Sequence, residues 1–357
     1  MTSSSALALK LVGVTKRFGD FTAVDNIDLE ISEGEFFTLV GPSGSGKTTM
    51  IRMLVGMDSP TSGEMLLRNK VINHVPANQR PTCMVFQDLA LFPHKSVGGN
   101  IEFPLKIAGV DKKTRYDRVV ELLKQIRLPV EYYDKSVNTC SGGERQRIAL
   151  ARALAFDPEI LFFDEPLSAL DFRLRKTLEK ALKDLHRETR KTFVYITHSL
   201  EEAMVMSDRI GIMRNGRLVQ VGTPHEIYNQ PVDKFVAEFM GEVNTLEVMR
   251  SGERQVLDRH GRSFEVGGLP EGFESGFLII RPEVAKIGNA GNGLANTIKA
   301  RLFNDYPLGS RVQYQARALE YDEQWLVERL QDEALDAAID EEVVIGWNPD
   351  DSIIVKE

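Results

Sequence analysis

The 357-residue sequence is poor in cysteine and has no long apolar run. Cys83 and Cys140 are its only cysteines, and neither has a CxxC spacing or a nearby histidine cluster. A disulfide framework and a zinc site are therefore not expected, and both thiols are expected to be reduced. No stretch approaches the ~20 continuous apolar residues of a membrane-spanning helix. Because residues 1–7 also lack a charged segment followed by an apolar one, we expect a cytoplasmic protein.

An excess of basic charge is also absent. The formal net charge is −8, and it is unevenly distributed: residues 1–241 carry 32 basic and 30 acidic side chains, while residues 242–357 carry 12 and 22. A nucleic-acid-binding protein normally shows a basic stripe, so this balance disfavours nucleic acid as a partner. A hydrophobic content of 42% is ordinary for a globular protein, and the length allows two domains.

The strongest motif is the loop at residues 41–48, which fits the phosphate-binding pattern G-x-x-x-x-G-K-[ST] at every fixed position. A β-prone apolar run precedes it and a helix-forming run follows, which disfavours a chance match. The glycines let backbone N–H groups point inward, the helix N-terminus adds partial positive charge, and Lys47 adds a full one. We expect Thr48 to hold magnesium. The loop consists of Gly41, Pro42, Ser43, Gly44, Ser45, Gly46, Lys47 and Thr48.

A continuous apolar run at residues 160–163 ends in two adjacent carboxylates, Asp164 and Glu165. Such a run is typical of a parallel strand that is buried on both faces and ends at the same sheet edge as the phosphate loop. We therefore expect Asp164 to hold magnesium and Glu165 to polarise a water molecule. Paired acids at a strand end are often only solvated turn residues, but the upstream loop favours the functional interpretation.

A second buried-type strand at residues 192–196 is followed by His198. A lone histidine usually satisfies a local hydrogen bond. At the end of a strand beside the same sheet edge, however, a contact between His198 and a γ-phosphate is the functional alternative.

Residues 141–147 precede a strong helix-forming segment at 148–154. Ser141 and Glu144 have the spacing of a capping box, in which each side chain binds the backbone N–H of the other. Gly142 and Gly143 leave the first turn unshielded, so an anion can approach the helix end. Taken alone, this cluster fits a plain capped helix and a second phosphate contact equally well.

Alternating apolar residues at 9–14 and 27–31 predict antiparallel strands on either side of a turn, with Phe18 at the bend. Phe18 either joins the core or stacks on a nucleotide base. The region from 88 to 156 has mostly helical periodicity, clearest at 115–127, and predicts an inserted helical subdomain. Asn215-Gly216 is a strong hairpin signal that is expected to close the first domain.

After a helical stretch at 225–240, Gly241 marks a change to short strands with frequent glycines, as at 277–280, 311–315 and 342–347. We expect a small β-barrel there. Apart from the N-terminal serines, the sequence has no low-complexity segment and no repeat with a period of about 20–50 residues.

Taken together, these motifs resemble the nucleotide-binding subunit of an ABC transporter. The resemblance covers about residues 7–240, and the β region after it resembles the C-terminal OB-fold extension of importer ATPases. It implies an α/β P-loop NTPase fold of the ABC type at 1–240, a helical subdomain at about 88–156, and an OB-like regulatory or dimerisation domain at 241–357. The matching segments are GPSGSGKT at 41–48, Gln87, SGGERQR at 141–147, ILFFDEP at 160–166, SALD at 168–171 and His198.

The resemblance also implies ATP and Mg²⁺ as ligands and assigns roles to residues that spacing alone does not. Gln87 matches the glutamine that senses magnesium and the attacking water, and Phe18 matches the adenine-stacking aromatic. The implied catalytic residues are Glu165, His198 and Gln87, and the implied magnesium ligands are Thr48, Gln87 and Asp164. The implied ATP contacts are Phe18, the loop at 41–48, Thr49, Ser141, Gly142, Gly143, Glu144 and Asp171.

Partners follow from the same resemblance. Such subunits form head-to-tail homodimers, in which the phosphate loop of one chain and the Ser141 helix of the other enclose each ATP. Two integral membrane permease subunits and, indirectly, an extracytoplasmic solute-binding protein are implied, so the chain would lie on the cytoplasmic face of the membrane. Residues 89–94 resemble the surface that meets the membrane subunit.

Two residues depart from the commonest LSGGQ form of the signature segment: Cys140 replaces Leu and Glu144 replaces Gln. Glutamate keeps the capping role but adds a negative charge near the phosphate of the partner's ATP, which leaves open whether the nucleotide sandwich is weaker.

We weigh three function classes. A single cassette with an acidic β domain favours an importer ATPase over a soluble ABC ATPase that acts on DNA or ribosomes, and a P-loop kinase has no use for the Ser141 cluster. Residues 235–244 and 308–311 resemble those of polyamine-type systems. Iron(III), sugar and small-anion importers compete with that choice.

Overall fold

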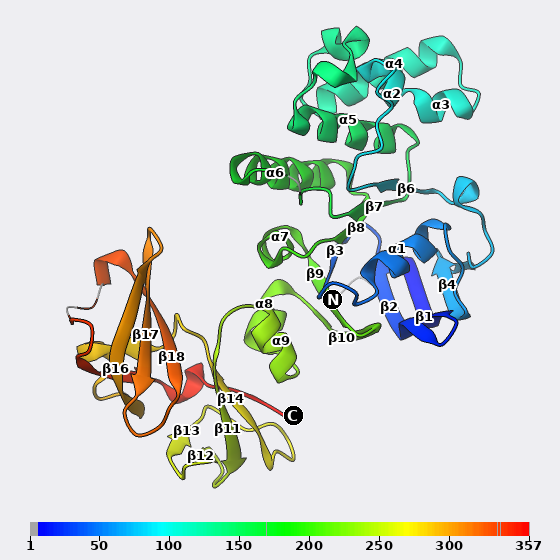
Figure 1. Cartoon of the computed structure of the whole chain (residues 1–357). Coiled ribbons are helices and arrows are strands. Elements are labelled where there is room, and N and C mark those ends of the chain that lie inside the picture. The colour runs from blue at the N-terminus through cyan, green and yellow to red at the C-terminus, as the bar shows by residue number, and fades with distance from the viewer. Residues whose placement is uncertain (1–5, 169, 334, 336, 357) are drawn as a thin grey trace. The chain divides into compact units, whose positions relative to one another are not determined.

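The computed structural model describes residues 6–168, 170–333, 335 and 337–356. The N-terminal residues 1–5 and Ala169 of the SALD segment lie outside this described part. By its internal contacts the chain divides into two compact units, residues 1–224 and 225–357 (Figure 1). In the described part no helix has the length and apolar character needed to cross a membrane.

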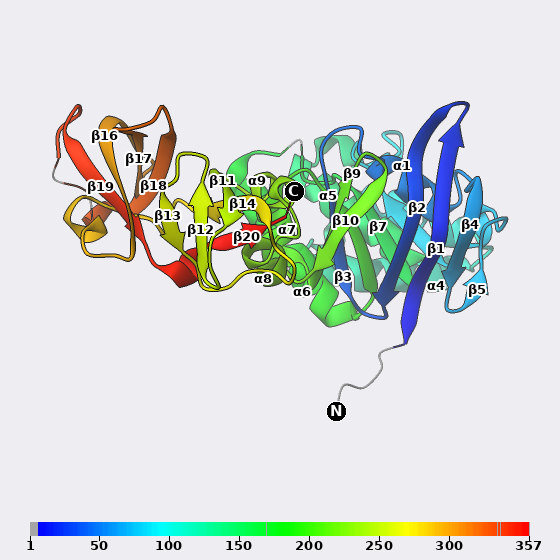
Figure 2. The same cartoon turned by 90° about the horizontal axis from the view of Figure 1, so that it is seen from below.

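The first unit contains two sheets. The six-stranded sheet has the order β10-β9-β3-β8-β7-β6, with parallel pairing from β9 to β6 and an antiparallel edge strand, β10. The four-stranded sheet is antiparallel, and Figure 2 shows its strands β2, β1 and β4 side by side. The strands are β1 (Leu7–Phe18), β2 (Phe21–Ser32), β3 (Phe36–Val40), β4 (Ser62–Leu67), β5 (Lys70–Val71), β6 (Thr82–Val85), β7 (Ile160–Asp164), β8 (Thr192–Ile196), β9 (Arg209–Arg214) and β10 (Arg217–Gly222).

Helices α2 to α5 lie between β6 and β7 in the chain, within the region 88–156 where the sequence predicts a helical subdomain (Figure 1). The segment predicted as its clearest helix, 115–127, corresponds to α4. The α-helices of this unit are α1 (Lys47–Val55), α2 (Val97–Ile101), α3 (Phe103–Ile107), α4 (Lys112–Gln125), α5 (Gly142–Ala155), α6 (Phe172–Thr189) and α7 (Leu200–Met206), and the 3₁₀ turns are η1 (Ala77–Gln79), η2 (Val130–Asp134) and η3 (Val137–Thr139).

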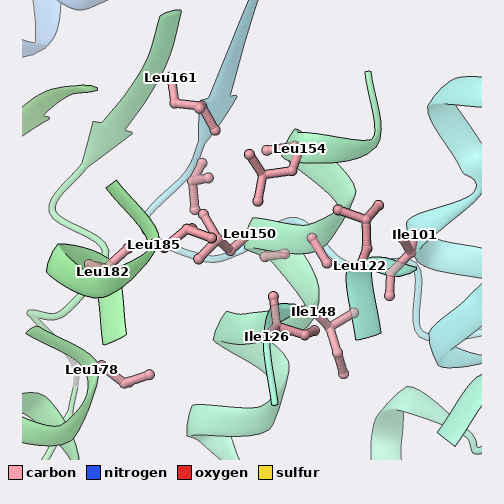
Figure 3. Close-up of a cluster of buried hydrophobic side chains, with 14 of the residues drawn as sticks. Ile101, Leu122, Ile126, Ile148, Leu150, Leu154, Leu161, Leu178, Leu182 and Leu185 are labelled. Carbon is pink, nitrogen blue, oxygen red and sulfur yellow. The ribbon is translucent and has the colours of Figure 1, made fainter. Parts of the chain in front are cut away.

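Strand β7 separates two hydrophobic cores. Leu161 and Phe163 face the core that contains α5 and α6, which Figure 3 shows around Leu161. Ile160 and Phe162 face the core beneath α1 and the four-stranded sheet. All four side chains are buried, as expected for a parallel strand covered on both faces. This packing fixes the carboxyl end of β7, where the paired acids follow.

Two hairpins have the turns that the sequence predicts. Asn215 and Gly216 join β9 to β10 with φ angles of 50° and 79°, the left-handed conformation of a tight hairpin turn. Phe18 and Phe21 face each other across the β1–β2 turn. The β9–β10 hairpin ends the first unit, since the two units divide directly after it.

The second unit is β-rich and consistent with an OB-like domain. Its strands pair as two five-stranded antiparallel sheets, of order β13-β12-β11-β14-β20 and β15-β19-β16-β17-β18, and β20 near the C-terminus pairs with β14. One core joins both sheets and contains Trp325 stacked on Trp347, with ring centres 5.2 Å apart. The strands are β11 (Asn244–Arg250), β12 (Gln255–Asp258), β13 (Ser263–Glu265), β14 (Ser275–Ile280), β15 (Lys286–Ile287), β16 (Asn296–Pro307), β17 (Arg311–Ala318), β18 (Gln324–Leu330), β19 (Glu342–Trp347) and β20 (Ile353–Val355), and the 3₁₀ turns are η4 (Gly288–Gly291), η5 (Gln331–Glu333) and η6 (Pro349–Asp351).

The division between the units falls earlier than the expected boundary at 240. The helical stretch predicted at 225–240 forms two helices, α8 (Pro224–Asn229) and α9 (Lys234–Phe239), interrupted around Pro231. Ala237 of α9 packs against Ile279 of β14, which places α9 with the β-rich unit.

Candidate functional site

The loop at residues 41–48 joins β3 to α1, as predicted. Gly46 has a φ of 103°, which other residues rarely adopt, and a Cβ there would lie 2.3 Å from the carbonyl oxygen of Ala23. A Cβ at Gly41 would lie 2.3 Å from the carbonyl oxygen of Met213. Residues Gly41, Pro42, Ser43, Gly44, Ser45 and Gly46 form the loop, and Lys47, Thr48 and Thr49 form the first turn of α1. The N-cap residue of α1 is Gly46, which has no side chain to cap the helix, so the first N–H groups of α1 are left for a ligand.

The side chain of Lys47 is buried within this loop. Its ammonium donates hydrogen bonds to the carbonyl oxygens of Gly41 at 2.7 Å and Pro42 at 3.0 Å. Both acceptors belong to the loop itself, so the lysine holds its positive charge inside the curve that the backbone forms. A phosphate in the loop would meet this charge together with the N–H groups of α1.

Charge interactions connect Lys47 to the two acids after β7. Burial lowers the pKa of Lys47, whereas the nearby carboxylates of Glu165 and Asp164 act to raise it. Burial raises the pKa of Asp164, the neighbouring Glu165 raises it further, and Lys47 opposes both effects. The site therefore places two acids and one buried cation within electrostatic reach of each other.

Glu165 and His198 come from the ends of neighbouring parallel strands and contact each other directly. Nδ1 of His198 lies 2.9 Å from Oε2 of Glu165. This contact occupies Nδ1, so Nε2 is the ring nitrogen that can face a substrate.

The backbone of Glu165 has a φ of 45°, a strained conformation for a residue other than glycine. Two neighbours hold it there: its N–H donates to the carbonyl oxygen of Ile196 at 2.9 Å, and the hydroxyl of Ser168 donates to its carbonyl oxygen at 2.9 Å. Nε2 of Gln87 donates to the same Ser168 hydroxyl at 3.2 Å. Gln87 and Glu165 are thus linked through Ser168, the first residue of the SALD segment.

Three predicted magnesium ligands offer oxygen donors of the kind that a hard cation takes: the hydroxyl of Thr48, the amide of Gln87 and the carboxylate of Asp164. In the described part of the chain, no group of three or more His, Cys, Asp or Glu side chains could hold a metal by itself. A cation at Asp164 would also oppose the two effects that raise the pKa of this carboxyl, its burial and the charge of Glu165. The donor set therefore fits magnesium that takes its remaining ligands from phosphate and water.

The N-terminus of α5 has the predicted capping box. The hydroxyl of Ser141 accepts from the N–H of Glu144 at 3.3 Å, and the Glu144 carboxylate accepts from the N–H of Ser141 at 2.7 Å. Gly142 and Gly143 follow the cap as the first helical residues. The capping interpretation is confirmed, whereas the phosphate contact stays a prediction.

Two contacts that sequence reasoning missed join α5 to the segment after Glu165. A Cβ on Gly143 would lie 2.6 Å from Cδ1 of Leu174, so a larger residue here would require this leucine side chain to move. Nε2 of the buried Gln146 donates to the carbonyl oxygen of Pro166 at 2.9 Å. Asp171, predicted as an ATP contact, caps α6 by accepting from the N–H of Leu174 at 3.0 Å. No local sequence pattern signals the two α5 contacts, since their partners are brought together only by the fold.

Phe18 lies at the tip of the β1–β2 hairpin and is 49% exposed, so it does not join the core. Phe21, opposite it, is 63% exposed. Nζ of Lys16 lies 4.9 Å from the centre of the Phe18 ring. An exposed aromatic beside a cation suits base stacking near a phosphate group, and that role stays a prediction.

The predicted site residues fall into three groups within one chain. The first contains the loop with Lys47 and the strand-end residues Gln87, Asp164, Glu165 and His198. The second is the capped α5 terminus, which packs on α6, and the third is the exposed tip around Phe18.

A phosphate loop after β3, acids after β7 of the same parallel sheet and a helical insertion with a capped Gly-Gly helix define the class of ABC-type P-loop ATPases. The comparisons with known proteins agree. The sequence profile of the family described as ABC transporter matches residues 24–168. The chain belongs to this family and is an ATP-binding subunit that hydrolyses ATP.

The spermidine/putrescine import ATP-binding protein of Rubrobacter xylanophilus is 44% identical over 87% of this chain and 84% of that protein. The protein of the same name from Thermotoga maritima is 39% identical over 98% of each chain. The dimeric structure of the bacterial ABC transporter cassette MJ0796 superposes with a TM-score of 0.54 at 34% identity, covering 60% of this chain and 98% of that one. A post-hydrolysis structure of the same cassette, bound to ADP and Pi, gives a TM-score of 0.54 at 33% identity over the same shares.

Proposed function

We propose that this ATPase energises the import of a polyamine of the spermidine or putrescine type. The observation that carries the proposal is the 39–44% identity to two proteins named for that import, one of which matches 98% of this chain. The likeness extends through the β-rich unit as well as the nucleotide domain.

We infer the following division of labour at the site. The N–H groups of α1 and the ammonium of Lys47 bind the ATP phosphates, which would replace the carbonyl oxygens of Gly41 and Pro42 as partners of the lysine. Glu165 polarises the attacking water, and Nε2 of His198 faces the γ-phosphate. Bound magnesium, held by Thr48, Gln87 and Asp164, would supply positive charge to the phosphates.

Two chains are proposed to act together as a head-to-tail homodimer. Within one chain the α5 terminus packs on α6 rather than on the loop at 41–48, so a second copy is needed to place a Ser141 helix opposite the loop. Two membrane permease subunits would hold the dimer at the cytoplasmic face of the membrane. An extracytoplasmic solute-binding protein would deliver the substrate to those permeases.

Hydrolysis and transport can be tested separately. Glu165→Gln is expected to keep ATP binding but to lower hydrolysis about 10²–10⁴-fold, because the amide is nearly isosteric and cannot act as a base. Normal hydrolysis by this variant would place the base elsewhere. The transport proposal is tested by spermidine uptake into vesicles that contain the wild-type complex and its permeases.

The same uptake experiment is repeated with each competing substrate. Uptake of iron(III), a sugar or a small anion, without spermidine or putrescine, would replace the polyamine proposal. Copurification with ribosomes or DNA instead of membrane subunits would indicate a soluble ABC ATPase of another kind.

The second unit is proposed to serve dimerisation or regulation rather than chemistry. Residues 242–357 carry 22 acidic and 12 basic side chains and no phosphate-binding motif. A chain that ends at Pro224 is therefore expected to retain ATP binding within about two-fold. Loss of binding in a folded, shortened chain would show that the β-rich unit contributes to the nucleotide site.

A further inference from the structure

The carboxylate of Glu144 is engaged on both of its oxygens by groups of its own chain. Oε2 accepts from the backbone N–H of Ser141 at 2.7 Å, and Oε1 accepts from the hydroxyl of Tyr132 at 2.9 Å. Nζ of Lys135 lies 3.8 Å from Oε2 and 3.7 Å from the centre of the Tyr132 ring. The capping box explains only the first of these contacts. Tyr132, on η2, and Lys135, directly after it, supply the others.

The carboxylate of Glu144 stays ionised near neutral pH. The hydrogen bond from Ser141 is the main cause that lowers the pKa of Glu144, and Tyr132 and Lys135 act in the same direction. A full negative charge therefore lies in the first turn of α5. Unless a cation balances it, that charge opposes the approach of a phosphate to the helix end.

Lys135 is the cation in position to balance this charge. The side chains of Lys135 and Glu144 are 28% and 19% exposed, so water screens their attraction less than that of a fully exposed pair. The ammonium of Lys135 lies over the ring of Tyr132, whose hydroxyl also orients the carboxylate. The pair has no net charge, and the dipole of α5 then acts on a ligand without an opposing carboxylate.

We propose that Tyr132 and Lys135 are positioning residues that orient and neutralise Glu144, so that a signature helix with glutamate can accept the phosphate of an ATP. This inference rests on the proposed head-to-tail homodimer. Under this inference Glu144 does not in itself weaken the nucleotide sandwich, because the compensating cation comes from the same chain.

The second departure from the common signature has a separate explanation. Cys140 is 5% exposed and packs in the core of the helical subdomain, with its Sγ 3.7 Å from the carbonyl oxygen of Ser136. Burial raises the pKa of this thiol, which therefore stays uncharged beside Lys135. Cys140 thus acts as a small apolar residue, and the electrostatic question concerns Glu144 alone.

The test is a double-mutant cycle in the full-length chain that carries Glu165→Gln. Labelled ATP with magnesium is bound, excess unlabelled ATP is added, and the release rate of the label is measured. Lys135→Met is expected to accelerate release about five-fold, the effect of exposing one partly screened charge. In the Glu144→Gln background the same substitution is expected to change release less than about two-fold, because no carboxylate remains to be neutralised.

Additional variants separate charge from structure. Lys135→Arg is expected to keep slow release, and Tyr132→Phe to accelerate it about two-fold by removing one hydrogen bond to Glu144. Lys113→Met, at an exposed lysine of α4, is the matched control and is expected to leave release unchanged. If Lys135→Met unfolds, Tyr132→Phe in the two Glu144 backgrounds supplies the same cycle.

Two results would overturn the inference. Equal acceleration by Lys135→Met in both backgrounds, or none in either, would show that Lys135 does not act through Glu144. Ser141→Arg in the same Glu165→Gln chain tests the dimer itself, because an arginine there blocks the helix end. If Ser141→Arg leaves the release rate unchanged, the sandwich is absent, and the dimer proposal fails together with this inference.

Discussion

The N-termini of α1 and α5 are both predicted to face phosphate, yet they are built differently. Helix α1 starts after Gly46 in a left-handed conformation, without a side-chain cap, and carries Lys47 in its first turn. Helix α5 starts after Ser141 with a complete capping box and carries Glu144 in its first turn. Both N-termini carry the partial positive charge of a helix dipole. The local charge and the unmet N–H groups therefore decide which end binds phosphate by itself.

This difference assigns the two ends unequal tasks. The α1 end offers uncapped N–H groups and a buried cation, so it is expected to hold ATP within one chain. At the α5 end, the capping box satisfies part of the backbone hydrogen bonding, and Lys135 is proposed to neutralise Glu144. We therefore expect this end to add a contact to a phosphate that the α1 end already holds. Removing a feature of α1 should therefore have a larger effect than removing one of α5.

The largest effect is expected from Lys47→Ala, which removes the buried cation from the α1 end. ATP binding or turnover should fall at least ~100-fold, because a charge-assisted contact to phosphate is lost and no other cation lies within the loop. Binding is measured with a fluorescent ATP analogue, and turnover by phosphate release. Lys70→Ala, on the exposed strand β5, is the control. ATPase at the wild-type rate in Lys47→Ala would refute the role of this loop.

The next effect is expected from Gly143→Ala at the α5 end. The new Cβ would lie 2.6 Å from Cδ1 of Leu174, and the resulting displacement is expected to cost about 1–3 kcal/mol of the free energy of unfolding. Far-ultraviolet circular dichroism during urea unfolding follows the helices, while both tryptophans, Trp325 and Trp347, report on the second unit.

Gly142→Ala is the matched control for that substitution. Its Cβ would lie 3.7 Å from Leu170, an ordinary contact, so the variant should be as stable as wild type or slightly more stable. Adding Leu174→Ala should recover part of the loss in Gly143→Ala. Equal stability of the two glycine variants would mean that the contact with Leu174 does not constrain α5.

The sequence predicted those parts of the site that depend on neighbours in the chain. The loop at 41–48 and the capping box at Ser141 each lie within eight residues, so spacing alone determines their geometry. The strand at 160–164 was predictable because burial on both faces leaves a continuous apolar run.

Contacts between distant segments could not be predicted in the same way. Gln146 reaches the carbonyl oxygen of Pro166, and Tyr132 reaches Glu144, only because the helical subdomain folds back on the strand ends and on its own turns. The boundary between the units was missed for a similar reason. Helical periodicity over 225–240 does not reveal that α9 packs on β14.

A smaller effect is expected from Ser141→Ala, which removes one half of the α5 capping box. Loss of the N-cap should lower the free energy of unfolding of the first unit by about 1 kcal/mol. Ser96 is the N-cap of α2, and its hydroxyl accepts from the N–H of Gly99. Ser96→Ala removes this cap and should lower the free energy of unfolding by a similar amount. Only Ser141→Ala should also speed ATP release from the Glu165→Gln chain. If both variants release ATP at the same rate, Ser141 serves only as a helix cap.

The smallest effect is a pH dependence of stability in the acid range at the α5 end, where Glu144 titrates. The hydrogen bond from the N–H of Ser141 lowers the pKa of Glu144 below its ordinary value of 4.5. A lowered pKa in the folded state means that the ionised carboxylate stabilises the fold. That contribution is fully present above about pH 4.5 and is lost as the pH falls through the lowered folded value.

Glu144→Gln keeps a capping side chain but cannot titrate. The difference in the free energy of unfolding between wild type and Glu144→Gln should therefore be constant at neutral pH and should shift against the wild type on acidification. Urea unfolding at a series of pH values measures this difference, and a difference that stays constant into the acid range would show that the cap of α5 does not depend on an ionised Glu144.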